Sequence, residues 1–148
     1  MPRVAIMMGS ESDQTVMQKA AVVLDEFGIE YEETVLSAHR NPERVVEFVR
    51  TAPERGVEIF ICGAGLSAAL PGVVAAHTEL PVIGVPLEAA LGGLDSLLSI
   101  AQMPPGVPVA CVGIGNARNA AYLAVCILAR GDDEIAKAWA GFRERQRG

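Results

Sequence analysis

Short apolar runs alternate with amphipathic helical patterns along the whole chain, and this alternation constrains the fold more than any other feature. Nearly continuous apolar strands separated by helices are typical of parallel sheets that are covered on both faces. Because crossovers between parallel strands are right-handed, the pattern predicts a doubly wound, three-layer α/β sandwich with a parallel sheet of about five strands. The predicted strands are Val4–Met8, Tyr31–Leu36, Val57–Cys62, Pro81–Val85 and Val107–Ile114.

Apolar residues at helical spacing predict six helices, which cover both faces of the sheet and end in a C-terminal helix. Gly28 ends the first helix, Pro42 begins the second, and Gly56 follows it as a stop. The other predicted ranges are Gln14–Phe27, Leu70–Thr78, Leu94–Ala101, Asn116–Arg130 and Asp132–Arg147.

The predicted helix Asn116–Arg130 is apolar on nearly every side. Such a helix is buried on more than one side. A subunit interface explains this pattern, and a central core helix explains it equally well.

The composition excludes several classes of protein. The length of 148 residues predicts a single domain over residues 1–148, and its 51% hydrophobic but only 5% aromatic residues predict an aliphatic core. The net charge of −6 argues against a nucleic-acid-binding surface, which is usually basic. No uninterrupted apolar stretch reaches transmembrane length, and no signal peptide is visible at Met1. We therefore expect a cytoplasmic protein with no nucleic-acid or membrane partner.

Three cysteines, Cys62, Cys111 and Cys126, are widely spaced in apolar segments. Their spacing matches no metal-ligand pattern, so we expect no metal site. We interpret them as small buried hydrophobic residues in a reducing cytosol.

The run from Ser37 to Pro42 holds one of the chain's two histidines, His39, beside Arg40. It follows a predicted strand and precedes a predicted helix, which is where open α/β sheets place their ligands. A histidine transfers protons near neutral pH, and an arginine binds anionic groups through a fork of hydrogen bonds. The pair indicates an enzyme that acts on a small phosphorylated or carboxylated molecule, although a surface histidine and a solvated ion pair are the simpler alternatives.

Two further loops follow neighbouring strands. The first, Gly9–Asp13, contains Ser10 and Ser12, and its glycine and free N–H groups suit phosphate binding, although serine and aspartate are more often simple helix caps. The second, Gly63–Gly72, is small and uncharged, so its backbone can approach a ligand closely. We expect the two loops and the His39 loop to converge.

Two other polar residues have simpler interpretations. His77 lies near the end of a short predicted helix, where it interacts with the helix dipole. Glu88 lies in a loop and is interpreted as a solvated charge.

Together these residues resemble the purine-biosynthetic family of N5-carboxyaminoimidazole ribonucleotide mutases and aminoimidazole ribonucleotide carboxylases. The similarity covers almost the whole chain, and the blocks occur in the family's order. The matching blocks are residues 8–13, 37–42, 63–65, 70–72, 81–86, 93–104, 106–109 and 119–120.

The resemblance implies a flavodoxin-like sandwich that assembles as a homo-octamer, with active sites completed by neighbouring subunits and with neither a metal nor an organic cofactor. Ser10, Asp13 and Arg40 match ribonucleotide-binding positions, Ser37 lies beside them, and His39 matches the catalytic acid–base. Gly9, Ser12, Gly65 and Leu70 belong to the same matching loops and are expected at the substrate site.

The implied mutase reaction moves a carboxyl group from the exocyclic nitrogen of an aminoimidazole ribonucleotide to the ring carbon C4. One departure concerns this reaction: mutases commonly carry a histidine immediately before Leu-Pro-Gly, and this chain has Ala69 there. The loop around Ala69 also resembles the branch of the family that carboxylates the ribonucleotide directly with CO2. Arg40 and the run Gly84–Pro86 favour the mutase, and direct carboxylation remains the alternative. The loops near Leu87–Gly92 and Gly115–Arg118 are shorter than in many mutases.

Two other functions are weaker alternatives. Carboxylases of the pyridinium dicarboxylate type share a related domain but usually carry a long additional N-terminal part. A non-catalytic nucleotide- or flavin-binding module fits the same fold, but flavins usually stack on aromatic residues, which are scarce here.

Overall fold

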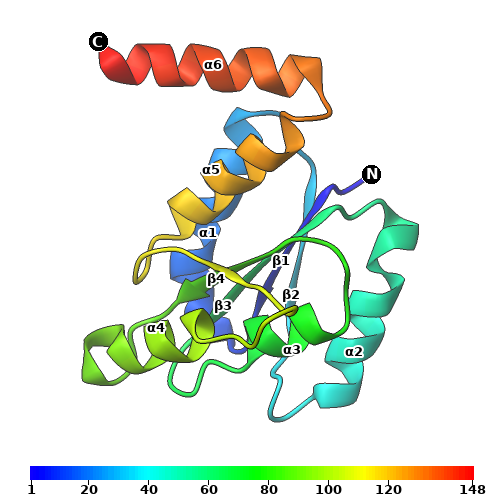
Figure 1. Cartoon of the computed structure of the whole chain (residues 1–148), viewed down its shortest axis with the longest axis vertical. Coiled ribbons are helices and arrows are strands. Elements are labelled where there is room, and N and C mark those ends of the chain that lie inside the picture. Colours follow the sequence, from blue (N-terminus) through cyan, green and yellow to red (C-terminus); the bar gives the residue numbers. More distant parts are fainter.

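A single parallel sheet organises the chain (Figure 1). The computed structural model describes residues 1–148. Its strands lie in the order β2-β1-β3-β4-β5, which is the flavodoxin-like order. The predicted three-layer α/β sandwich is confirmed. The strands are β1 (Val4–Met8), β2 (Tyr31–Val35), β3 (Ile59–Ala64), β4 (Val82–Pro86) and β5 (Ala110–Cys111).

Six α-helices connect and follow the strands. Gly28 and Gly56 stop the first two helical segments as predicted, and both have positive φ angles that suit glycine. The predicted second helix ends in a short 3-10 turn, Ala52–Arg55. The helices are α1 (Gln14–Glu26), α2 (Pro42–Thr51), α3 (Leu70–Ala76), α4 (Leu94–Ala101), α5 (Ala117–Leu128) and α6 (Asp133–Arg147).

The two faces of the sheet carry separate apolar cores. On β1, Val4, Ile6 and Met8 pack with residues of α1 and α5. The alternating residues Ala5 and Met7 pack with residues of α2, α3 and α4. Since every β1 residue is fully buried, the strand has no polar face, which is why it is apolar throughout its length.

The register of the sheet aligns the carboxyl ends of three strands. Met8, the last residue of β1, lies opposite Val35 of β2 and Gly63 of β3. The loops that follow these strands therefore emerge at one edge of the sheet. This edge includes the point between β1 and β3 where the strand order reverses, and ligands bind at such points in open α/β sheets.

The fifth strand is much shorter than predicted. Only Ala110 and Cys111 pair with β4, whereas the apolar pattern predicted a strand over 107–114. Pro108 has no N–H to donate to a ladder, and the exposed Gly113 follows the paired residues. The third strand is displaced by two residues. At its start, the Val57 N–H donates to the Ala52 carbonyl in the preceding turn, and at its end Gly63 and Ala64 pair with Val85 and Pro86 of β4.

The helix α5 is a core helix of the chain. Its buried alanines, Ala117, Ala120, Ala121 and Ala124, belong to the core that α1 and the sheet form. Small side chains let α5 approach α1 closely, so packing within the chain itself explains the apolar pattern of this helix.

The last helix, α6, lies across the end of α5 and away from the sheet (Figure 1). Four aromatic rings attach it there: Phe27, Tyr122, Trp139 and Phe142, with centroid separations from 4.8 to 6.4 Å. At its N-terminus the Asp132 side chain accepts hydrogen bonds from two backbone N–H groups and pairs with Arg3 at 2.7 Å. None of the helices is long and apolar enough to span a membrane.

The cysteines differ in burial. Cys62 is fully buried on β3, where burial raises the pKa of its thiol. Cys111 and Cys126 are half-buried, and all three are free. The interpretation as a small buried hydrophobic residue is confirmed for Cys62.

The packing between β4 and α4 predicts the effect of Gly84→Ala. A Cβ atom at Gly84 would lie 2.4 Å from Ile100 Cγ2 and 3.1 Å from Val109 Cγ1. Since both neighbours are branched at Cβ and stiff, we expect the substitution to lower the free energy of unfolding by about 1–3 kcal/mol. Thermal or urea unfolding measures this change. Gly131→Ala is the matched control, because nothing lies within 4 Å of a Cβ there, and equal stability of the two variants would contradict the prediction.

Candidate active site

A cavity of about 370 Å³ lies at the carboxyl edge of the sheet, where the loops after β1, β2 and β3 meet. The nine residues that the sequence predicted for the site all line this cavity, although they come from three separate loops. They are Gly9, Ser10, Ser12, Asp13, Ser37, His39, Arg40, Gly65 and Leu70. The predicted convergence of the three loops is therefore observed.

The sequence prediction missed other lining residues, most of them small. Ala38 and Ala64 adjoin predicted residues, and Leu66, Ser67, Ala68 and Ala69 complete the third loop. Ala89 comes from the loop after β4. A Cβ on Gly65 would lie 3.4 Å from both Ala89 Cβ and the Leu87 carbonyl oxygen, so the third and fourth loops pack closely at this glycine. The small residues of Gly63–Gly65 were the only signal in the sequence that another loop could approach closely here.

The first loop presents hydroxyl groups at the start of a helical segment. Ser10 has an extended backbone and begins a 3-10 turn, Glu11–Asp13, which continues into α1. Its Oγ accepts a hydrogen bond from the Ser12 N–H at 3.3 Å and lies 3.0 Å from the Ser12 Oγ. Burial raises the pKa of the Asp13 carboxyl, and a hydrogen bond with the Ser10 backbone offsets part of this shift. The loop thus offers two hydroxyls and one half-buried carboxylate to a ligand.

The second loop presents the cavity's only histidine and its only arginine. Ser37 fixes the loop, because its Oγ accepts a hydrogen bond from the Arg40 N–H at 3.1 Å. Both His39 and Arg40 are exposed, and neither side chain has a partner within the protein. The imidazole and the guanidinium are therefore free to contact a ligand.

The third loop forms an apolar wall. Its backbone is tightly turned: Leu66 and Ala68 have positive φ angles of 56° and 33°, which residues with a side chain rarely adopt. The Ala68 N–H donates to the Gly65 carbonyl at 2.9 Å and closes the turn. Strained backbone of this kind gathers at ligand sites. Ser67 is the only residue of Gly65–Leu70 with a polar side chain.

The cavity is thus divided by chemistry. Serine hydroxyls, one carboxylate, one imidazole and one guanidinium line the side formed by the first two loops. Alanine, glycine and leucine, with Ser67 as the one polar side chain, line the side formed by the third loop and Ala89. A ligand with a charged, hydroxyl-rich part and a flat, less polar part matches this division. A nucleotide has that form.

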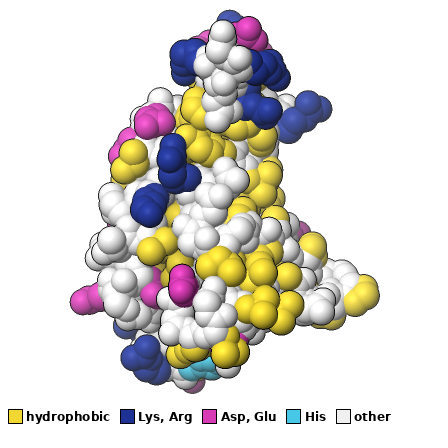
Figure 2. All heavy atoms as spheres, turned by 90° about the vertical axis from the view of Figure 1, so that its left-hand side faces the viewer, with side chains coloured by type: hydrophobic (Ala, Val, Ile, Leu, Met, Phe, Trp, Pro, Cys, Tyr) yellow, Lys and Arg dark blue, Asp and Glu magenta, His cyan; other side chains and the backbone are white.

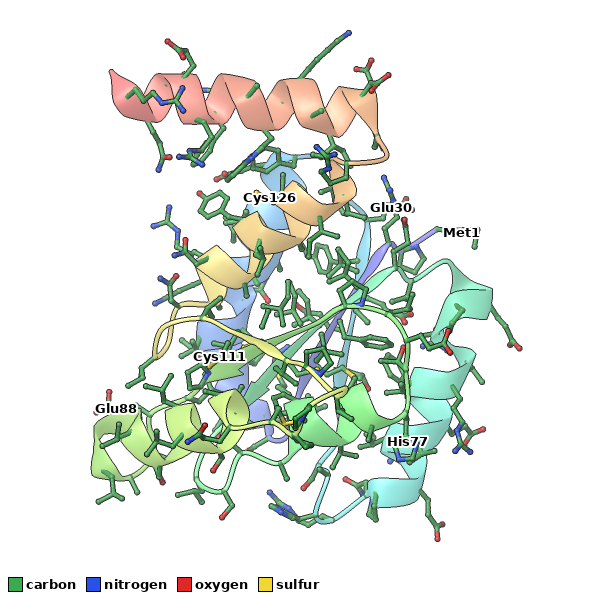
Figure 3. The ribbon with its side chains drawn as sticks, viewed as in Figure 1. Met1, Glu30, His77, Glu88, Cys111 and Cys126 are labelled. Carbon is green, nitrogen blue, oxygen red and sulfur yellow. The ribbon has the colours of Figure 1, made fainter.

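The other polar residues considered in the sequence lie outside the cavity. His77 follows the C-terminal end of α3, and Glu88 is exposed in the loop after β4 (Figure 3). No group of three or more His, Cys, Asp or Glu side chains is arranged to hold a metal ion.

Comparison with known proteins gives consistent results. The model of the AIR carboxylase family matches residues 3–148. An N5-carboxyaminoimidazole ribonucleotide mutase of Pyrococcus abyssi is 59% identical over 97% of this chain and 83% of its own length. A phosphoribosylaminoimidazole carboxylase of Schizosaccharomyces pombe is 52% identical over 99% of this chain but over only 27% of its own length.

The fold agrees with this similarity in sequence. The crystal structure of Treponema denticola PurE superposes with a TM-score of 0.89 and 35% identity, over 99% of this chain and 92% of that one. A match of this extent to the family model, together with these identities, establishes the family. The chain belongs to the AIR carboxylase family.

Proposed function

We propose that the chain is an N5-carboxyaminoimidazole ribonucleotide mutase of purine biosynthesis. Its similarity to the mutase of Pyrococcus abyssi covers most of both proteins, whereas the Schizosaccharomyces pombe carboxylase is mostly a different, longer chain. The observation that carries the proposal is one loop that presents His39 and Arg40 to a cavity that the third loop lines with mostly small, apolar residues.

The polar side of the cavity binds the ribose phosphate in this proposal. Arg40 supplies the cation for the phosphate, and the hydroxyls of Ser10, Ser12 and Ser37 supply further hydrogen bonds. Asp13 accepts hydrogen bonds from sugar hydroxyls. These roles explain how a protein with a net charge of −6 binds an anion: a local cation and backbone N–H groups suffice.

His39 carries the proton through the reaction. Its imidazolium protonates the exocyclic carbamate nitrogen, the bond from that nitrogen to the carboxyl carbon breaks, and CO2 is released. The electron-rich ring carbon C4 then attacks the CO2, and the neutral imidazole removes the C4 proton. One group that first gives and then takes a proton works best when it ionises near neutral pH, as imidazole does.

The apolar side retains the intermediate. Gly65, Ala68, Ala69 and Leu70 offer no charge that would hold water beside the heterocycle. A small water-poor space keeps CO2 next to C4 until the new bond forms. Ala69, which replaces the histidine that mutases commonly carry, belongs to this wall, so His39 is the only imidazole at the site.

Two substrates offered separately test the proposed function. We expect turnover of N5-carboxyaminoimidazole ribonucleotide to 4-carboxy-5-aminoimidazole ribonucleotide without added bicarbonate, because the carboxyl group comes from the substrate itself. Product formation followed by absorbance or chromatography measures it. Turnover only of 5-aminoimidazole ribonucleotide with CO2 would instead establish direct carboxylation, and binding without turnover of either substrate would establish a non-catalytic module.

His39→Asn tests the proton carrier. We expect kcat to fall by at least about 100-fold, because asparagine cannot exchange a proton near neutral pH, while nucleotide affinity changes little. Steady-state kinetics and equilibrium binding measure the two effects. His77→Asn is the control, since His77 lies outside the cavity, and undiminished turnover in His39→Asn would overturn the assignment.

We also propose a homo-octamer whose neighbouring subunits complete each site, in a cytoplasmic location. Exposed apolar side chains support self-association: Leu91, Leu94, Leu98 and Ile114 are 77%, 52%, 50% and 40% exposed. Figure 2 faces the side of the molecule on which α4 lies, and hydrophobic side chains gather over its lower half. Leu91 is two residues from Ala89, which lines the cavity. A subunit that covers this surface would therefore border the active site.

Light scattering tests the assembly. We expect a mass of about eight chains in solution, because the family resemblance implies an octamer and self-association would cover the exposed apolar side chains. Leu94→Glu with Leu98→Glu should reduce the mass and the turnover together if neighbours complete the site. A monomer with full activity would contradict the proposal.

A further inference from the structure

Asn41 occupies the N-cap position of α2 without capping the helix. An N-cap asparagine usually accepts a hydrogen bond from a backbone N–H in the first turn of its own helix. The Asn41 side chain makes no such bond. Asn116, at the N-cap of α5, shows the usual arrangement, because its Oδ1 accepts from the Asn119 N–H at 3.0 Å.

The Asn41 side chain instead points back into the loop that carries His39. The side-chain Oδ1 accepts a hydrogen bond from the Ser37 N–H at 3.3 Å, and the backbone N–H of Asn41 donates to the Ser37 carbonyl at 2.8 Å. The Arg40 N–H donates to the Ser37 Oγ at 3.1 Å. Three hydrogen bonds thus join Ser37 to Arg40 and Asn41, and Ala38 and His39 lie in the closed turn between them.

The loop backbone sets the point from which the imidazole reaches into the cavity, and no side-chain hydrogen bond restricts the ring further. The His39 side chain is exposed and makes no hydrogen bond in the protein, so no partner orients the ring directly. An acid–base group must reach its proton at about 2.6–3.2 Å, and a misplacement of about 1 Å can cost about 100-fold in rate. A hydrogen bond that fixes the loop therefore bears on the chemical step.

We propose that Asn41 is a positioning residue that holds His39 in place through the hydrogen bond from the Ser37 N–H to its side-chain oxygen. The inference rests on the proposed function, because it assigns the loop a role in proton transfer. It goes beyond the cavity itself, since Asn41 does not line it. Helix capping does not explain the Asn41 side chain, because this side chain leaves the N-terminus of α2 uncapped.

Two substitutions at Asn41 distinguish the effect of the acceptor oxygen from the effect of side-chain size. Asn41→Leu keeps the approximate volume and removes the oxygen, whereas Asn41→Asp keeps an oxygen at the same position. We expect kcat of Asn41→Leu to fall about tenfold or more and KM to change less than about threefold, because binding is shared by several groups. Asn41→Asp should recover most of the lost kcat.

Asn116→Leu is the matched control. It removes an asparagine that does cap its helix, so the unfolding temperature should fall while kcat stays near the value of the unmodified protein. Asn41→Leu should show the opposite pattern, with a nearly unchanged unfolding temperature and a reduced kcat.

Each other outcome overturns the inference. Unchanged kcat in Asn41→Leu would show that the hydrogen bond does not position His39. Equal loss in Asn41→Leu and Asn41→Asp would show that the acceptor oxygen is not the cause, and an unfolded Asn41→Leu protein would show that the residue supports the fold instead. The unmodified protein is assayed alongside: if it fails to convert the carbamate substrate, the proposed function fails, and if only the variants differ from expectation, the positioning role fails.

Discussion

Pairing of β1 on both of its edges is the constraint on which the rest of the structure depends. Its five residues are fully buried, bond to β2 on one side and to β3 on the other, and send alternate side chains into two separate cores. A strand in this position tolerates no polar residue, because neither face meets water. The same pairing aligns the ends of three strands, so the position of the site follows from the register of the sheet.

The site combines groups that no single loop supplies. The loop after β1 brings hydroxyls and a carboxylate, the loop after β2 brings the imidazole and the guanidinium, and the loop after β3 brings an apolar wall. In the proposed function, this division lets one cavity serve both an anionic sugar phosphate and a CO2 intermediate. Ala69 extends the apolar wall at a position where mutases commonly carry a second imidazole.

Hydrogen bonds to the backbone of the site loops hold these loops in place, and several of them are accepted by side-chain oxygens. Ser10 and Ser37 each bond to the backbone of their own loop, and Leu66 and Ala68 are kept in strained conformations by a turn of the third loop. Loops fixed in this way leave the His39 and Arg40 side chains unpartnered and available to a ligand. In the proposed function, this preorganisation lets one imidazole act in both proton transfers.

The sequence by itself determined the order of strands and helices along the chain, the three-layer sandwich and the convergence of three loops, in which it placed nine of the 16 residues that line the cavity. It did so because apolar periodicity reports burial, and because loops that follow parallel strands share one edge. Only the tertiary structure decided how long β5 is, since an edge strand next to Pro108 pairs over two residues although its sequence is apolar throughout. Only the fold brought Ala89 to the cavity, because its approach depends on packing against Gly65 from a distant loop. The tertiary structure also decided the direction of the Asn41 side chain. An asparagine before a helix predicts a cap, but the Asn41 Oδ1 accepts from the nearby Ser37 N–H instead.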